Sequence, residues 1–243
     1  MTYCVGLHLD RGLVFMSDTR TNSGVDNISV FPKMRTWSVP GERVITILSA
    51  GNLATTQTVT GLLEERSKRP SNRNPSLLKA PTLFEVARLI GSTLREVIAA
   101  QDDSGPEASS TFSATLIVGG QITGMEPRLF LIYPEGNFIE TSADTPFFQI
   151  GETKYGRPIL LRSFERDMSF EAAVKLLMVS FDSTIKANLS VGLPLDLHAY
   201  QADTLDVGVQ QRIEVDDPYF AAISDGWGDA LKHAFRSLPD YTF

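Results

Sequence analysis

Cysteine is almost absent from this chain of 243 residues, which contains only Cys4. A single cysteine cannot form a disulfide within the chain, and this excludes the disulfide-rich secreted scaffolds. Long apolar runs are also missing. No stretch reaches the roughly 20 residues that a transmembrane helix needs, and no basic start with an apolar segment resembles a signal peptide. We therefore expect a protein of the reducing cytoplasm with no membrane partner.

Basic residues are too few and too scattered for a nucleic-acid-binding surface. The chain has 22 Lys and Arg against 29 Asp and Glu, which gives a net charge of −7. No expected helix or strand carries a dense basic face. The basic stretch SKRPSNRNPSLLK at 67–79 is typical of a solvated loop, and acidic DDSGPEASS at 102–110 also indicates a loop. We expect no nucleic-acid partner.

Several common catalytic signatures are absent. The chain has no GxSxG turn, no GxxxxGK[ST] phosphate loop and no HExxH helix. Its histidines, His8, His198 and His233, fall on separate expected elements, and none has a Cys or carboxylate nearby at metal-ligand spacing. The sequence therefore predicts neither a metal site nor a cofactor.

Hydrophobic periodicity divides the chain into groups of strands and groups of helices. Alternating apolar residues predict strands at 3–9, 13–18, 33–37, 43–50, 112–120, 128–136, 137–143, 195–202 and 205–215. Helical spacing and capping residues predict helices at about 52–66, 82–98, 151–164, 169–188 and from 217 onward. Gly156 and Pro158 are expected to interrupt the third of these helices.

These groups do not alternate as βαβ units do. The economical packing is an α+β fold, a four-layer αββα sandwich in which two mainly antiparallel sheets lie face to face and helix pairs cover their outer sides. An apolar content of 42% is enough for such a core. Because no linker or repeat separates the halves, we expect one domain over residues 1–243.

The first strand begins unusually close to the start of the chain. If Met1 is removed, Thr2 becomes a residue that carries both a hydroxyl nucleophile and a free α-amine. The amine has a reference pKa of about 8, so it is substantially neutral near physiological pH and can act as a base. The hypothesis is that the strand starts here because the first mature residue is catalytic.

Four short motifs strengthen this hypothesis. Thr2, Asp18 in SDTR, Lys33 in FPKM and the SAGNLAT turn around Gly51 together resemble the proteasome β-subunit family of N-terminal nucleophile hydrolases. MTYCVGL and AGNLATTQ are specifically similar to the bacterial proteasome-related group called Anbu. The resemblance is strongest over about the first 60 residues, and the order of elements extends it along the chain.

The resemblance implies a role for each motif residue. Thr2 would be the nucleophile and its amine the general base, Lys33 would lower the pKa of this unit, and Asp18 would hold Lys33 charged and in place. The N–H of Gly51 would bind the oxyanion. By the same similarity, Thr21 would align a peptide substrate as an added strand, and the first specificity pocket would be lined by Phe31, Ser49 and Leu53.

The chain departs from the proteasome pattern at two accessory places. Glu152 stands where many β-subunits have a serine that supports the terminal amine. A later support motif, usually an Asp followed by Ser and Gly, is replaced by Asn188 with Ser190 displaced by one position. Cys4 could replace Thr2 as nucleophile only if two further residues were removed, so a buried structural role is expected for it.

Two classes of function follow from these observations. The first is a threonine-type peptidase or amide hydrolase that self-associates into a homo-oligomeric ring or open helical turn. The second is a non-catalytic ring-forming scaffold subunit, and an amidase for small substrates with the same fold is a third possibility. Whether an unfoldase partner delivers substrates is left open by the sequence.

Overall fold

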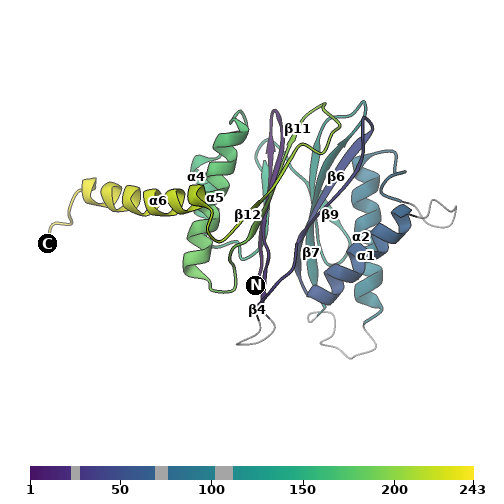
Figure 1. Ribbon diagram of the computed structural model, residues 1–243, viewed down its shortest axis with the longest axis horizontal. Coiled ribbons are helices and arrows are strands. Elements are labelled where there is room, and N and C mark those ends of the chain that lie inside the picture. The colour runs from purple at the N-terminus through teal and green to yellow at the C-terminus, as the bar shows by residue number, and fades with distance from the viewer. Residues whose placement is uncertain (23–27, 69–75, 102–111) are drawn as a thin grey trace.

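The computed structural model describes residues 1–22, 28–68, 76–101 and 112–243. The loop predicted at 102–110 and most of the one predicted at 67–79 lie outside these described residues. Figure 1 shows two sheets face to face, with helices on the outer side of each. The expected α+β sandwich is confirmed.

Every strand pair is antiparallel. The first sheet has the order β10-β1-β2-β11-β12; its strands are β1 (Tyr3–Leu9), β2 (Gly12–Asp18), β10 (Phe147–Gly151), β11 (Leu195–Gln201) and β12 (Val209–Ile213). The second has the order β5-β6-β7-β8-β9; its strands are β5 (Met34–Val39), β6 (Arg43–Gly51), β7 (Ala114–Ile122), β8 (Arg128–Ile132) and β9 (Phe138–Glu140). A small ribbon of β3 (Arg20–Asn22) and β4 (Ile28–Val30) lies between β2 and β5 in the sequence.

In the described part of the chain, two helix pairs cover the sheets, and α6 leaves them. α1 (Leu53–Lys68) and α2 (Leu83–Ala99) flank the second sheet, and α4 (Arg157–Ser163) and α5 (Phe170–Ala187) flank the first (Figure 1). α6 (Pro218–Ser237) starts beside α5 and projects away from the sandwich. Among the helices of the described residues, we find none whose length and hydropathy would suit a membrane span.

Three apolar clusters fill the spaces between the four layers. One lies between α1, α2 and the second sheet and includes Leu63, Ile90 and Phe130. A second lies between the sheets and includes Phe15, and a third joins the first sheet to α4 and α5 through Phe181. Strands covered on both faces are almost fully buried, as the burial patterns of β1, β2 and β6 show.

The capping predictions hold for three helices. Thr82, Ser169 and Asp217 each accept a hydrogen bond from the backbone N–H three residues ahead, which satisfies one of the N–H groups left free at a helix start. Pro218 occupies the first turn of α6, where its missing N–H leaves no hydrogen bond unmade. The helix boundaries therefore follow from side chains that can be read in the sequence.

The helix predicted at 151–164 is wrong in its first half. Gly151 ends β10, a strand that the sequence analysis did not predict, and α4 begins only at Arg157. Gly156 is the N-cap and Pro158 lies in the first turn, so neither interrupts the helix. A Cβ at Gly156 would lie 2.2 Å from the Tyr3 hydroxyl oxygen, so the glycine lets β1 approach α4 closely. The ribbon β3–β4 was also not predicted.

Candidate active site

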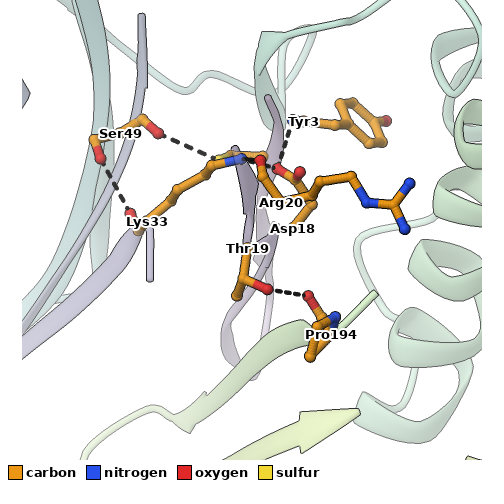
Figure 2. A network of polar contacts seen from close by, with 8 residues as sticks. Tyr3, Asp18, Thr19, Arg20, Lys33, Ser49 and Pro194 are labelled. Atoms are coloured by element: carbon orange, nitrogen blue, oxygen red, sulfur yellow. Dashed lines mark hydrogen bonds and ion pairs between the residues drawn. The ribbon is translucent and has the colours of Figure 1, made fainter. Parts of the chain in front are cut away.

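A buried ion pair lies beside the start of the N-terminal strand. Nζ of Lys33 lies 2.7 Å from Oδ1 of Asp18, and the two side chains are 6% and 0% exposed. The same Nζ donates a hydrogen bond to the carbonyl oxygen of Arg20 at 2.6 Å. The backbone N–H of Tyr3 donates to Oδ1 of Asp18 at 3.0 Å (Figure 2). The pair is thus connected to β1, β2 and β3.

Backbone contacts bring Lys33 back to Asp18. Asp18 is the last residue of β2, and Lys33 comes one residue before β5. The N–H of Phe31 donates to the carbonyl oxygen of Thr19 at 2.8 Å, which closes the segment between the two. From the second sheet, the N–H of Ser49 donates to the Lys33 carbonyl oxygen at 3.0 Å, and its Oγ donates to the same oxygen at 3.3 Å (Figure 2). Lys33 is therefore held from both sheets.

Thr2, the residue before Tyr3, is held by contacts with the end of β10. Its carbonyl oxygen accepts a hydrogen bond from the N–H of Glu152 at 2.7 Å. Gly151 has φ +83°, and a Cβ there would lie only 1.9 Å from the same carbonyl oxygen. Glycine is needed at this position both for the left-handed conformation and for the close approach. The start of β1 is consequently held from both neighbouring strands: Thr2 is bonded on the β10 side and Tyr3 is bonded to Asp18 on the β2 side.

A cavity of about 560 Å³ opens in front of Thr2 and Lys33. The first turn of α1 borders it, with Asn52 as the cap that accepts a hydrogen bond from the N–H of Thr55 at 3.1 Å. N–H groups at a helix start favour negative charge. Twelve residues line the cavity: Met1, Thr2, Thr21, Lys33, Ser49, Ala50, Gly51, Asn52, Leu53, Ala54, Thr56 and Gly151.

Gly51 closes one wall of this cavity. Its φ is +118°, and a Cβ would lie 2.5 Å from the carbonyl oxygen of Ser113. No other residue fits here without displacing β7. Gly51 therefore leaves its backbone uncovered at the cavity wall, at the end of β6 and just before α1.

Charges around the cavity change the pKa of two groups. Burial lowers the pKa of the Met1 amine, and the Lys33 ammonium lowers it further, whereas Asp18 and Glu152 act in the opposite direction. Burial raises the pKa of the Asp18 carboxyl, against the effects of the Lys33 ammonium and the Tyr3 N–H. A lowered amine pKa increases the fraction of neutral amine near pH 7, which is the form that can accept a proton.

Two buried oxygen atoms at the site have no hydrogen-bond partner among the residues that the structure describes. They are Oδ2 of Asp18 and Oγ1 of Thr21. Buried polar atoms are usually satisfied, so an exception calls for an explanation. Thr21 borders the cavity, and its free hydroxyl can therefore bond to a molecule that enters.

The three accessory residues form a connected chain. Nδ2 of Asn188 donates to Oε2 of Glu152 at 3.0 Å, and the N–H of Ser190 donates to Oδ1 of Asn188 at 2.9 Å. Glu152 is 8% exposed. The two places where the sequence departs from the proteasome pattern, Glu152 and Asn188 with Ser190, are thus in direct contact.

The sequence-predicted set is brought together with one exception. Phe31 is half-buried and is not among the described residues that line the cavity. Cys4 is fully buried in the cluster between the sheets, and burial raises the pKa of its thiol. Sequence reasoning missed the Arg20 carbonyl, because a backbone acceptor leaves no sequence signal. It also missed the cavity wall formed by Thr56, which the position of this residue in the first turns of α1 could have indicated.

The site contains no evident metal centre. Within the described ranges, no group of three or more His, Cys, Asp or Glu side chains is arranged to hold a metal ion. Among the described residues that line the cavity or bond to its lining, charged side chains belong to Lys33, Asp18, Glu152 and Arg20, and Arg20 meets Lys33 through its carbonyl oxygen. These groups can bind, orient and shift protons.

Comparison with known proteins identifies the family. A scan against protein-family models and a search of curated proteins found no match. Solved structures do match over the full length: Anbu from Yersinia bercovieri is 47% identical with a TM-score of 0.92, and Anbu from Hyphomicrobium sp. strain MC1 is 49% identical with a TM-score of 0.91, each covering 100% of both chains. A helical assembly of the Anbu complex from Pseudomonas aeruginosa is 48% identical with a TM-score of 0.92, covering 99% of this chain and 98% of that one. The chain therefore belongs to the Anbu family of proteasome-related proteins.

Proposed function

We propose that this protein is a hydrolase of peptide or other amide bonds that uses Thr2 as an N-terminal nucleophile after Met1 is removed. The observation that carries the proposal is the buried Lys33–Asp18 pair at the wall of a cavity that Thr2 also lines. A desolvated ion pair is costly to maintain, and one that borders a cavity is a candidate for chemistry.

The proposed reaction is an acyl transfer through Thr2. The hydroxyl oxygen attacks the substrate carbonyl carbon while its proton passes to the α-amine, and the resulting ammonium then protonates the leaving amine. The acyl group is left as an ester on Thr2. A water molecule hydrolyses this ester with the same amine as base and regenerates the hydroxyl. The Lys33 ammonium favours the neutral amine and the alkoxide character of the nucleophile.

The cavity wall supplies the remaining roles. We assign the oxyanion contact to the N–H of Gly51, where the absent side chain lets a substrate carbonyl approach. Thr21, whose Oγ1 has no partner, would bond to the substrate backbone. Ser49 and Leu53 would line the first specificity pocket, as their place in the cavity wall supports. Phe31 is not retained in that role.

Self-association is part of the proposal. The Pseudomonas aeruginosa relative forms a helical assembly, and it is 48% identical to this chain over nearly the whole length. We therefore expect this chain to assemble into a ring or an open helical turn.

The state of Met1 provides the test. While Met1 is attached, the nitrogen of Thr2 is an amide whose lone pair is delocalised into the carbonyl, and it cannot act as the base. Protein from its native cell should therefore have an intact mass lower by one methionine. An epoxyketone peptide should then modify both the hydroxyl and the amine of Thr2, because only an N-terminal nucleophile can close that ring.

Three variants complete the experiment. Thr2→Ser should retain part of the turnover of a fluorogenic peptide amide, Thr2→Ala should abolish it, and Cys4→Ala should change it little. A processed protein without turnover of peptides or small amides would contradict the proposal and favour a non-catalytic scaffold. Turnover of small amides alone, with no cleavage of longer peptides, would favour the small-substrate amidase.

A further inference from the structure

The wall of the active-site cavity is polar but offers no carboxylate. Among the twelve described residues that line the cavity, Lys33 has the only charged side chain, and none is aromatic. The carboxylates of Asp18 and Glu152 are buried and already bonded to Lys33 and Asn188. A lysine or arginine side chain of a substrate would therefore enter beside an ammonium with no free anion to pair with, which weakens its binding.

Two hydroxyl groups of this wall use their single proton inside the protein. Oγ of Ser49 donates to the carbonyl oxygen of Lys33 at 3.3 Å (Figure 2), and Oγ1 of Thr56 donates to the carbonyl oxygen of Leu53 at 3.0 Å. Ser49 and Thr56 are 8% and 6% exposed, and both border the cavity. Because a hydroxyl has one proton and two lone pairs, each group offers only lone pairs to a molecule in the cavity.

Backbone N–H groups on the same wall provide donors. Leu53 and Ala54 are the first two residues of α1, and both border the cavity. Asn52 accepts hydrogen bonds from the N–H groups of Thr55 and Thr56, whereas those of Leu53 and Ala54 have no acceptor within the described ranges. The first N–H groups of a helix lack partners within the helix and favour an acceptor oxygen. The wall therefore presents donors and lone pairs together.

This combination suits a carboxamide side chain. A carboxamide carries two N–H donors and one carbonyl acceptor, and it has no charge. Its N–H groups can pair with the lone pairs of Ser49 and Thr56, and its oxygen can accept from the N–H groups of α1. A carboxylate of the same shape has acceptors only, so one oxygen would face the hydroxyl lone pairs. An apolar side chain of the same length would leave all of these groups without partners.

We propose that the first specificity pocket selects glutamine or asparagine, so that the enzyme cleaves the amide bond on the carboxyl side of a carboxamide residue. Ser49 and Thr56 are the specificity-determining acceptors, and the N–H groups of Leu53 and Ala54 are the donors. Thr21, whose Oγ1 has no partner among the described residues, stays available for the substrate backbone. The inference rests on the proposed function and adds the class of substrate to it.

Four fluorogenic peptides that differ only in the residue before the scissile bond test the pocket. Glutamine is compared with glutamate, methionine and lysine, which have similar lengths but carry a charge or lack the amide. On protein from which Met1 has been removed, kcat/KM for the glutamine peptide should exceed that for each other peptide at least about tenfold, because unmet hydrogen bonds in a closed pocket typically cost this much. An equal or higher kcat/KM for any of the other three would overturn the proposal.

A matched pair of threonine variants tests the role of Thr56. Thr56→Val removes the acceptor and keeps the branched shape, so the ratio of kcat/KM for the glutamine peptide to that for the methionine peptide should fall about tenfold, whereas Thr56→Ser should preserve it. The control is Thr58→Val, because Thr58 lies exposed on the same helix and its Oγ1 donates to the carbonyl oxygen of Ala54 at 2.8 Å. The control should leave the ratio at its wild-type value. An unchanged ratio in Thr56→Val, or an equal fall in Thr58→Val, would refute the assignment.

Digestion of an unfolded protein distinguishes a wrong pocket from a wrong enzyme class. Casein incubated with the processed protein and analysed by mass spectrometry should yield new carboxyl termini mainly at glutamine and asparagine, and a parallel Thr2→Ala digest controls for contaminating proteases. Cleavage mainly after apolar or charged residues would refute this pocket and leave the hydrolase proposal intact. A processed protein that cleaves neither the four peptides nor casein would refute the hydrolase proposal, and the pocket assignment with it.

Discussion

Replacing Lys33 by methionine removes the cation from the buried pair and leaves the Asp18 carboxyl, which is 0% exposed, without its ionic partner. The remaining donor to Asp18 is the backbone N–H of Tyr3. Breaking a buried ion pair on one side typically costs about 3–5 kcal/mol of unfolding free energy at neutral pH, because a charge stays buried without compensation. We expect a loss of this size for Lys33→Met.

The pH dependence of this loss has a definite sign. Burial already raises the folded-state pKa of Asp18 above its unfolded value, and in Lys33→Met this pKa rises further because the opposing ammonium is gone. The stability deficit of the variant relative to wild type is therefore fully present above the variant's folded-state pKa and shrinks as the pH falls through it. Urea denaturation at pH 7 and pH 5 should show the deficit shrinking at the lower pH.

A double-mutant cycle separates stability from catalysis. The double variant Lys33→Met with Asp18→Asn lacks both charges. Its loss of unfolding free energy should be about 2–3 kcal/mol smaller than the sum of the two single losses. The value of kcat/KM should stay roughly 10²–10⁴-fold below wild type in every variant that lacks Lys33. All variants are compared at one protein concentration, because self-association adds stability by mass action. If the two single losses of unfolding free energy add within about 0.5 kcal/mol, Lys33 and Asp18 do not stabilise each other as argued. Full activity of Lys33→Met would refute the catalytic role of Lys33.

Two further predictions concern neighbours of Thr2. Tyr3→Phe removes a hydroxyl that contacts Ser180 Oγ at 2.7 Å and Gln149 Nε2 at 2.6 Å, so urea denaturation should show a loss of about 1–3 kcal/mol; an unchanged midpoint would mean that water replaces the hydroxyl. Glu152→Gln removes a carboxylate that raises the pKa of the Met1 amine. We expect the same Coulombic effect on the Thr2 amine once Met1 is removed, so the acid limb of the kcat/KM profile should move to lower pH. A move to higher pH would contradict this electrostatic role.

Much of the fold could be predicted because periodicity and capping act locally. The stripe of α2 and the cap at Thr82 are both visible in the sequence, and both are confirmed. β10 was missed because FFQI was assigned to no element and its last residue, Gly151, was assigned to the start of the following helix. A strand of five residues, as β10 is at the edge of its sheet, has too short a pattern to be distinguished by periodicity alone.

The site was predictable only where a side chain carries the chemistry. Thr2, Asp18 and Lys33 could be selected by residue type and resemblance, and the structure places the last two in contact. Phe31 was chosen by similarity for a pocket, but its backbone N–H is engaged with Thr19 and its side chain does not line the cavity. Which way a side chain points at the end of a short ribbon depends on tertiary contacts that no local pattern records.

The relation between the replacements at Glu152 and Asn188 is visible only in the structure. In the sequence they look like two independent losses of hydrogen-bonding groups. In the structure they bond to each other, and a carboxylate with an amide donor is a satisfied pair. Glu152 also holds the Thr2 carbonyl oxygen through its own N–H. One residue therefore supports Thr2 through its backbone and connects it to the loop at 188–193 through its side chain.

That loop leads back to the ion pair. Nη1 of Arg20 donates to the carbonyl oxygen of Leu189 at 3.0 Å, and the Arg20 carbonyl oxygen accepts from Lys33. A Cβ at Gly192 would lie 2.4 Å from Cζ of Arg20, so any other residue there would require the guanidinium to move. Thr2 is thus held by Glu152, the residue after β10. The Lys33 ammonium is held by Arg20, which contacts the loop at 188–193, and Asn188 of that loop bonds to Glu152. Because the loop contacts both Glu152 and Arg20, displacing it would disturb Thr2 and Lys33 together. Residues of the loop are therefore constrained by their contacts, although they take no direct part in the proposed reaction.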